Sequence, residues 1–234
     1  TGEFPDPVGI VLPGGREVAF ALTQSRLQPR QAMAAITKDA GDDPDVTHGA
    51  VVRVMVEPGD PGGGVRFAGG EGVGTVTLPG LPLPVGEPAI NPKPREYITA
   101  NITAAAERIG VAPDVHVTVS IDDGARIAEK TWNSRIGVIG GLSVLGTTGV
   151  VVPYSCSAWI ASIHRGIDVA IATGATHAAA CTGSTSERVA EELYPGIELL
   201  DMGDFAGAVL KYLRKHPLPT LTIVGGVAKL SKLA

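Results

Sequence analysis

Residues 135–149 read RIGVIGGLSVLGTTG, an apolar run that leads directly into a glycine-rich loop. Gly141 and Gly146 have the spacing of a phosphate-binding loop, but Thr147 stands where that motif requires lysine. No Gly-x-Gly-x-x-Gly dinucleotide motif can be drawn through the glycines. The loop is therefore predicted to let backbone amides approach a ligand other than a triphosphate. The alternative is that its glycines serve only tight packing of a strand against a helix.

The same pattern of an apolar run that ends in glycine recurs toward the end of the chain, at residues 135–141, 167–174, 197–203 and 221–226. Helices are predicted between the later runs, because Ser184–Glu187 has the form of a capping box and Asp204 can cap residues 205–216. This alternation predicts a Rossmann-like α/β domain with a mainly parallel sheet over residues 131–234. The glycine-marked ends are expected to line one crevice, since ligands of such sheets bind outside the carboxyl ends of the strands.

Residues 1–130 are predicted to form a mixed α+β domain. Two short strands are expected on either side of a turn at residues 13–15, and further strands at 48–59 and 115–121. In the last of these, valine and isoleucine alternate with polar residues, which indicates a half-buried strand. Helices are expected at residues 28–38 and 94–109. The Gly/Pro-dense segment 57–95 is expected to be irregular, and such long loops are often functional.

Composition narrows the class of protein. The 234 residues carry a formal net charge of −5, and only 4% are aromatic, which disfavours nucleic acid and membrane surfaces as partners. No segment resembles a membrane span or a signal peptide. Cys156 and Cys181 lack zinc or disulfide spacing, fit a reducing compartment and are expected to be buried thiols. A cytoplasmic protein without a metal site is predicted.

Several polar groups are candidates for chemistry. The segment 38–50, KDAGDDPDVTHGA, concentrates aspartates beside His48 but lacks the EF-hand order, so a solvated turn with side-chain-to-backbone bonds is the simpler interpretation. Arginine and lysine near residues 126–135 and at 165 can bind carboxylates or be ordinary surface charge. His177 is predicted in a ligand-facing loop, where it could orient a substrate or move protons. No nucleophile with an adjacent base was identified.

The blocks KDAGDDPDVTHGA (38–50), GGEGVGTVT (69–77), VGEPAINPKPRE (85–96), the stretch 129–155, CTGSTSE (181–187), MGDFAGAVLKYL (202–213) and VGGVAKLSKLA (224–234) resemble, in order, the signature blocks of the CbiD family. That family comprises cobalt-precorrin-5B C1-methyltransferases of anaerobic cobalamin biosynthesis. Two segments that its members carry, an N-terminal Thr-Thr-Gly block and a C-terminal Thr-His-Ser stretch, are not in this chain.

The resemblance implies methyl transfer from S-adenosyl-L-methionine to carbon C1 of a cobalt tetrapyrrole. A loop of glycines and hydroxyls suits this donor, because it offers ribose hydroxyls, an amino-acid end and a sulfonium, but no phosphate. The cofactor-binding residues are then expected to be Gly140, Gly141, Ser143, Gly146, Thr147, Thr148, Gly174, Thr182 and Gly183. The substrate-binding residues are expected to be Asp42, Asp43, Asp45, His48, Arg126, Lys130, Arg135, His164, Arg165 and His177.

The implied chemistry is catalysis by positioning, since the sulfonium already activates the methyl group and only alignment and exclusion of water are needed. The basic residues would offset the carboxylates of the acceptor. Two other functions stay open: a non-catalytic carrier of corrinoid intermediates and, less well supported, a nicotinamide oxidoreductase. The partners expected are the tetrapyrrole itself, other enzymes of the pathway and further copies of the chain in a homo-oligomer.

Overall fold

The computed structural model describes residues 3–233, which form two compact units. Unit 1 comprises the chain up to Thr77 together with Pro82–Tyr154, and unit 2 comprises Leu78–Leu81 and the chain from Ser155 onward. The boundary therefore follows Tyr154, whereas the sequence placed it near residue 130. The chain passes between the units three times, because the short segment Leu78–Leu81 belongs to unit 2.

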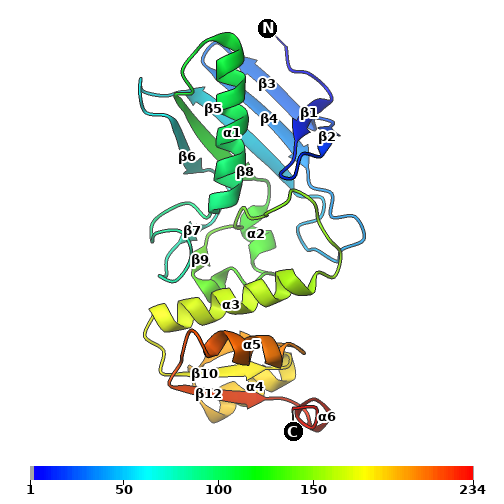
Figure 1. The fold of residues 1–234 in the computed structure, drawn as a ribbon, viewed down its shortest axis with the longest axis vertical. Helices are drawn as coiled ribbons and strands as arrows, with labels where there is room; N and C mark the ends of the chain where they lie inside the picture. Colours follow the sequence, from blue (N-terminus) through cyan, green and yellow to red (C-terminus); the bar gives the residue numbers. More distant parts are fainter. Residues whose placement is uncertain (1–2, 234) are drawn as a thin grey trace. The chain divides into compact units, whose positions relative to one another are not determined.

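Unit 1 is built on a five-stranded sheet with the order β3-β4-β5-β8-β6, in which only β6 and β8 are parallel (Figure 1). Its strands are β3 (Gln24–Gln28), β4 (Gln31–Thr37), β5 (Val51–Pro58), β6 (Val65–Gly69) and β8 (Val115–Ile121). Helix α1 (Pro92–Ile109) lies across one face of this sheet (Figure 1). Pro92 is tolerated at its start because the first helical N–H has no partner in the helix, and Gly110 ends it with φ 70°.

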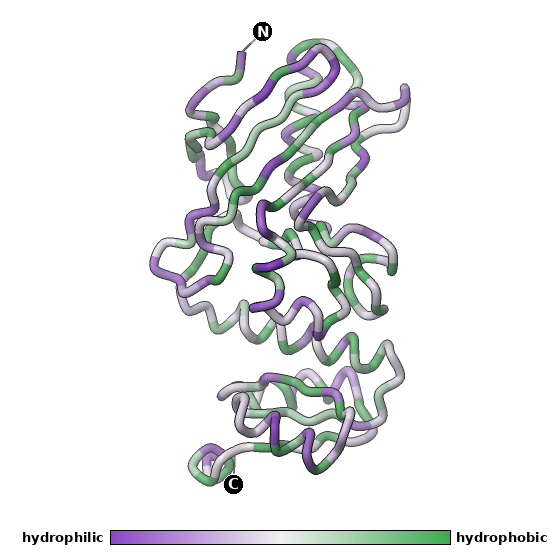
Figure 2. The backbone as a smooth tube through the Cα atoms, turned by 180° about the vertical axis from the view of Figure 1, so that it is seen from behind, coloured by the Kyte–Doolittle hydropathy of each residue, from purple (hydrophilic) through white to green (hydrophobic). Residues whose placement is uncertain are grey.

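The core of unit 1 follows most clearly from alternation along β8, and Figure 2 shows hydrophobic and hydrophilic stretches along the backbone. Val117 and Val119 of β8 are 0% and 1% exposed, as the sequence predicted. They pack in one cluster with Ile90 and the α1 residues Ile98 and Ile102. The opposite face of the strands stays partly exposed, which is normal for an antiparallel sheet with one covered face.

Smaller elements complete unit 1. Strands β1 (Val8–Val11) and β2 (Glu17–Phe20) pair antiparallel around the predicted turn. Strand β7 (Thr75–Val76) pairs antiparallel with β9 (Val138–Ile139), and between α1 and β9 the chain also forms α2 (Gly124–Ala128) and the 3-10 helix η1 (Ser134–Ile136). The predicted strand at 135–141 is thus a two-residue strand of unit 1, paired with the irregular segment, and not the first strand of the parallel sheet. This pairing carries residues 131–154 into unit 1.

Unit 2 is a layered α/β structure with three parallel strands in the order β11-β10-β12. The strands are β10 (His177–Cys181), β11 (Glu198–Asp201) and β12 (Thr220–Val224), and the helices are α3 (Cys156–Ala172), α4 (Ser184–Leu193), α5 (Ala206–Leu213) and α6 (Val227–Leu230). Helices α3 and α5 pack on Ala178 and Ala180 of β10, and α4 packs on Ala179 and Cys181. Alanine suits β10 because helices cover both of its faces closely.

Three sequence predictions of secondary structure are wrong. Residues 28–38, predicted as a helix, contain strand β4, because pairing with β3 and β5 overrides the helix propensity of alanine and glutamine. Residues 167–174, predicted as a strand, lie mostly in α3, where Ile163, Ile167 and Ala170 recur at helical spacing and are buried. Strand β10 was missed.

Caps and thiols also differ from expectation. Helix α4 is capped by Gly183, and α5 by Phe205 without a side-chain bond, so neither Ser184 nor Asp204 acts as the predicted N-cap. Asp204 instead pairs with Lys229. Cys181 is buried as predicted, whereas Cys156 is exposed at the start of α3. No helix in the described part of the chain is both long and apolar enough to cross a bilayer.

Candidate functional site

Three predicted substrate-binding residues meet at a pocket in unit 1. His48 from the loop 38–50, and Arg126 and Lys130 from the region of α2, line an open pocket of about 330 Å³. The other lining residues are Val46, Gly49, Ala50, Val51, Asp122, Asp123 and Ile127. We call this the unit 1 pocket. Residues far apart in the sequence therefore form one concave surface that presents cations and an imidazole.

The α2 side of the pocket is held by close backbone contact. A Cβ on Gly124 would lie 2.2 Å from the carbonyl oxygen of Gly72, and a Cβ on Gly72 would lie 1.9 Å from the carbonyl oxygen of Ile121, so both positions require glycine. Asp123, which precedes α2, adopts a left-handed conformation with φ 55°. Its carboxylate accepts a hydrogen bond from Arg126 at 2.9 Å, and this ion pair raises the pKa of the guanidinium. The short helix thereby carries Arg126 to the pocket, and Lys130 follows two residues after its end.

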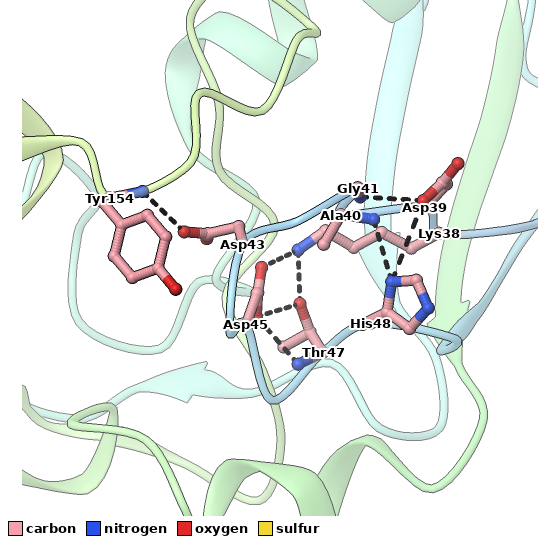
Figure 3. A network of polar contacts seen from close by, with 9 residues as sticks. All are labelled: Lys38, Asp39, Ala40, Gly41, Asp43, Asp45, Thr47, His48 and Tyr154. Carbon is pink, nitrogen blue, oxygen red and sulfur yellow. Dashed lines mark hydrogen bonds and ion pairs between the residues drawn. The ribbon is translucent and has the colours of Figure 1, made fainter.

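The loop side is held by a polar network (Figure 3). The Lys38 ammonium donates to both Asp45 and Thr47. The Asp45 carboxylate also accepts from the backbone N–H of Thr47 at 2.8 Å and from its hydroxyl at 2.7 Å. Burial alone would raise the pKa of Asp45, but the bonds from Lys38 and Thr47 outweigh it and lower the pKa. Asp45 is therefore a carboxylate that shapes the loop.

His48 is oriented by the same loop. Its Nδ1 accepts a hydrogen bond from the backbone N–H of Ala40 at 3.1 Å (Figure 3). A nitrogen that accepts a bond carries no proton, so the neutral imidazole bears its proton on Nε2. Asp39 lies 3.9 Å from Nδ1 and accepts the N–H of Gly41 at 2.8 Å. His48 thus lines the pocket with its tautomer set by the backbone N–H of Ala40 in its own loop.

The remaining aspartates of the loop have different surroundings. Asp43 accepts the backbone N–H of Tyr154 at 2.9 Å, which ties the loop to the last residue of unit 1 (Figure 3). Asp42 is exposed. Bonds of Asp39 and Asp45 to N–H groups two residues later are those of the solvated turn considered from the sequence. Contact of Asp42, Asp43 or Asp45 with substrate stays a prediction.

The glycine loop 140–149 does not have the context from which cofactor binding was predicted, because it follows β9 in unit 1 and no strand of the parallel sheet. A Cβ on Gly141 would lie 2.4 Å from the carbonyl oxygen of Gly72. The carbonyl of Gly141 accepts from the Asn133 amide at 3.2 Å, and Ser143 donates to Asn133 at 3.4 Å. Gly141 therefore packs against the backbone of Gly72, and Ser143 is hydrogen-bonded to Asn133, while cofactor contact at either residue stays a prediction.

The rest of this loop is open. A Cβ on Gly140 or on Gly146 would meet nothing within 4 Å. Thr147 accepts a hydrogen bond from the Tyr97 hydroxyl through its carbonyl, and the Thr148 hydroxyl donates to the carbonyl of Val150 at 3.1 Å. The side chains of Thr147 and Thr148 are exposed. Cofactor contact at these positions remains a prediction without the strand-end geometry that motivated it.

In unit 2, Thr182 and Gly183 lie at the carboxyl end of β10, as predicted for a ligand edge. The N–H of Thr182 donates to the carbonyl of Val224 at 3.1 Å and to the Ser186 hydroxyl at 3.0 Å. A Cβ on Gly225, directly after β12, would lie 2.9 Å from the Thr182 side chain. The ends of β10 and β12 are therefore in close contact. Gly225 was not among the predicted site residues, although it is one of the two glycines that end the run 221–226.

Gly174 and His177 lie at the other end of the sheet. Gly174 follows α3 and leads into β10, and His177 is the first residue of that strand. His177 bonds to the Thr222 hydroxyl at 2.8 Å and meets the Tyr194 ring edge-on at 4.8 Å between centroids. The prediction that His177 sits in a ligand-facing loop at the carboxyl ends is wrong, because the missed strand β10 reverses its position.

The other predicted basic residues have structural surroundings. His164 of α3 stacks on Tyr212 at 3.8 Å, and burial lowers its pKa. Arg165 pairs with Asp168 at 3.0 Å, and Arg135 lies in η1, outside the pocket lining. The structure therefore brings His48, Arg126 and Lys130 together and leaves Arg135, His164, Arg165 and His177 elsewhere. Within residues 3–233, no group of three or more His, Cys, Asp or Glu side chains could hold a metal ion.

Asp122 and Ile127 of the pocket were not predicted. Asp122 is paired with Arg53 of β5 at 2.9 Å, and this link between strand and pocket has no local sequence signal. Ile127 packs with the core of unit 1.

The geometry defines a mixed α/β protein with a small parallel sheet toward its carboxyl end and a polar pocket on its larger unit. A family model described as CbiD matches residues 1–153. Cobalt-precorrin-5B C(1)-methyltransferases from Brucella anthropi and Brucella canis are each 59% identical over 236 residues, covering 100% of this chain. The chain belongs to the CbiD family.

The chain spans 64% of the length of those Brucella relatives. A crystal structure of the cobalamin biosynthesis protein cbiD from Archaeoglobus fulgidus is 25% identical, with a TM-score of 0.49 over 97% of this chain and 70% of that one.

Proposed function

We propose that the protein methylates carbon C1 of cobalt-precorrin-5B with S-adenosyl-L-methionine as methyl donor. The observation that carries this proposal is the 59% identity, along the whole chain, to relatives named as cobalt-precorrin-5B C(1)-methyltransferases. The order of the family blocks along the sequence supports it independently of any single residue.

We place the methyl donor at the carboxyl end of the parallel sheet in unit 2. Strand β10 is followed by α4 on one face, and β11 is followed by α5 on the other, so the chain order reverses at β10. In doubly wound sheets ligands bind at this switch point, between the loops that leave in opposite directions. Unit 2 is in this sense Rossmann-like. The proposed contacts are Thr182, Gly183 and Gly225.

The donor needs little chemistry from the protein. A sulfonium-bound methyl group transfers in line with the bond that breaks, so the side chains have to hold two substrates in register and exclude water. Hydroxyl and backbone groups such as those of Thr182 and Gly183 can bond to ribose hydroxyls and an amino-acid carboxylate. The unit 1 pocket supplies cations and an imidazole for the acceptor, whose periphery carries carboxylates.

The first experiment is calorimetric titration with S-adenosylhomocysteine, the demethylated product of the donor, with NADH and ATP as controls. We expect selective binding, and we expect Gly225→Val to weaken it because the added side chain collides with Thr182. Gly207→Ala is the matched control, since its Cβ meets nothing within 4 Å. Binding of NADH in preference to S-adenosylhomocysteine would support an oxidoreductase instead.

Methyl transfer is then measured by mass spectrometry on cobalt-precorrin-5B. A mass gain of one methyl group that requires S-adenosyl-L-methionine is the expected result. Tight binding of the tetrapyrrole that does not depend on the methyl donor and leaves the tetrapyrrole unmethylated would contradict the proposal. It would identify the protein as a carrier.

A further inference from the structure

We propose that the unit 1 pocket binds a carboxylate side chain of the tetrapyrrole acceptor, with Lys130, Arg126 and His48 as its donors. This inference rests on the proposed function for the identity of the ligand. A volume of about 330 Å³ lies at the small end of ligand pockets. It suits one peripheral side chain of the acceptor, with the macrocycle outside.

The charges of the lining favour an anion. Asp122 is paired with Arg53, and Asp123 is paired with Arg126, so each carboxylate of the lining already has a cation. The ammonium group of Lys130 has no ion-pair partner among the described residues and is solvent-exposed. A carboxylate entering the pocket therefore meets the ammonium group of Lys130, which is not engaged in an ion pair, although Glu129 also acts on Arg126 from the same wall.

Arg126 adds direction to that charge. Only one terminal nitrogen of its guanidinium bonds to Asp123, and its side chain is 65% exposed. Arginine carries five N–H donors in a planar fork, so others remain available for a carboxylate. Because the Asp123 bond restrains the side chain, less rotamer freedom is lost when Arg126 binds a ligand.

His48 contributes a third donor. Its Nδ1 is occupied by the N–H of Ala40, so its proton lies on Nε2, and no partner of Nε2 occurs among the described residues. An Nε2–H can donate to a carboxylate oxygen without adding charge. The pocket thereby combines one free ammonium, one partly engaged guanidinium and one oriented N–H.

Both walls are held before any ligand arrives. On one side the loop is braced by Lys38, Asp45 and Thr47, and on the other α2 is pressed against Gly72 through Gly124. An ordinary surface groove with mobile lysines would lack this bracing, and exposed charge pairs by themselves contribute little. Preorganisation is what distinguishes the pocket.

The test uses uroporphyrin, a porphyrin polycarboxylate, titrated into the intact protein and followed by its absorbance band. Lys130→Gln should weaken binding roughly tenfold, because a charge-assisted hydrogen bond is lost, and should reduce its salt dependence. Lys130→Arg should retain most of the affinity. Lys93→Gln is the control, since Lys93 is an exposed lysine of unit 1 that pairs with Glu96 away from the pocket. It should change affinity by less than about twofold.

The outcomes separate the two proposals. Unchanged uroporphyrin affinity in Lys130→Gln, or equal losses in Lys130→Gln and Lys93→Gln, would overturn the pocket assignment even if methyl transfer is observed. The pocket assignment is supported if Lys130→Gln weakens uroporphyrin binding and Lys93→Gln does not. Weaker binding of coproporphyrin, which has fewer carboxylates than uroporphyrin, supports it further. Such selective loss would stand even if S-adenosylhomocysteine fails to bind, in which case only the methyltransferase proposal fails.

Discussion

The surroundings of His164 change its pKa. It lies between α3 and α5, stacked on Tyr212, which in turn stacks on His216 at 4.2 Å. Its Nε2 is buried without a hydrogen-bond partner among the described residues. Burial disfavours the charged imidazole and lowers its pKa below 6.5, although nearby Asp168 opposes this, and burial with the Asp168 bond raises the pKa of Tyr212 to about 12.

The consequence is a pH dependence of stability. The unfolded chain binds a proton at His164 near pH 6.5, whereas the folded protein resists it, so the free energy of unfolding should fall as pH drops below 6.5. In His164→Phe, which keeps an aromatic ring at this position, the dependence should flatten. Urea unfolding between pH 5 and 7, with the exposed His116→Gln as control, measures this. An identical slope in His164→Phe and the parent would contradict the assignment.

Asp45 gives the same direction of pH dependence for the opposite reason, because here it is the loss of a stabilising charge that lowers stability as pH falls. Its folded pKa is lowered by Lys38 and Thr47 despite burial, so its charge stabilises the fold above pH 3.8 and this contribution is lost as pH falls through the folded pKa. We expect Asp45→Asn to cost about 1 kcal/mol at neutral pH, the order of one charge-assisted hydrogen bond at a partly buried site. Denaturation at pH 7 and pH 3 checks it. A cost that persists undiminished at pH 3 would mean that charge is not its origin.

At the scale of elements, the glycines of unit 1 have a packing function that their spacing concealed. Gly72 and Gly74 lie in one segment and Gly124 and Gly141 in two others, and each would place a Cβ within 3 Å of another segment's atoms. The backbones of residues 72–74 and 141–142 also exchange hydrogen bonds at 2.9 Å. The glycine loop therefore contains a backbone-to-backbone joint at Gly141 and Leu142, whereas Gly140 and the distal part from Leu145 onward are exposed.

A pair of substitutions separates packing from ligand binding. Gly141→Ala should lower the free energy of unfolding by about 3 kcal/mol, because the added methyl overpacks the contact with Gly72. Gly207→Ala, in open space on α5, should raise it by about 0.5 kcal/mol through helix propensity. Thermal or urea unfolding measures both. If Gly141→Ala leaves stability unchanged and abolishes only S-adenosylhomocysteine binding, Gly141 contacts the cofactor and the packing explanation is wrong.

Elements with a strong local pattern were predictable from sequence. Strand β8 alternates cleanly, β11 and β12 are short apolar runs between turns, and α1 is bounded by proline and glycine. The errors came where local and long-range preferences conflict. Residues 31–37 have a helix-favouring composition but gain two strand partners, and α3 contains an apolar run that is strand-like when its flanking helical period is ignored.

At the scale of the molecule, the segment Leu78–Leu81 is a part of unit 2 that lies, in sequence, within unit 1. It belongs to unit 2, where a Cβ on Gly80 would lie 2.6 Å from the carbonyl of Asp168 in α3. Gly80 has φ 103°, a conformation that only glycine adopts easily. Unit 2 therefore includes a piece of chain from the Gly/Pro-dense region that the sequence marked as a long loop.

This predicts the behaviour of a nicked protein. If a protease site is inserted between Val151 and Val152 and cut, the two fragments should co-elute in gel filtration, because Leu78–Leu81 on the first fragment packs within unit 2. Gly80→Val should loosen that packing and increase the separated fraction. Clean separation of the fragments without Gly80→Val would show that the segment contributes little.

The amino-acid sequence alone determined the family, the mixed α+β character of the first part and a parallel sheet toward the end, because family blocks, turn residues and strand periodicity are local patterns. It also singled out His48, Arg126 and Lys130 as candidates. Only the tertiary structure decided that these three share a pocket, that Gly141 serves packing, and that His177 lies away from the strand ends. Such outcomes depend on which distant segments pair, and β-sheet pairing between distant segments leaves no spacing in the sequence from which it can be read.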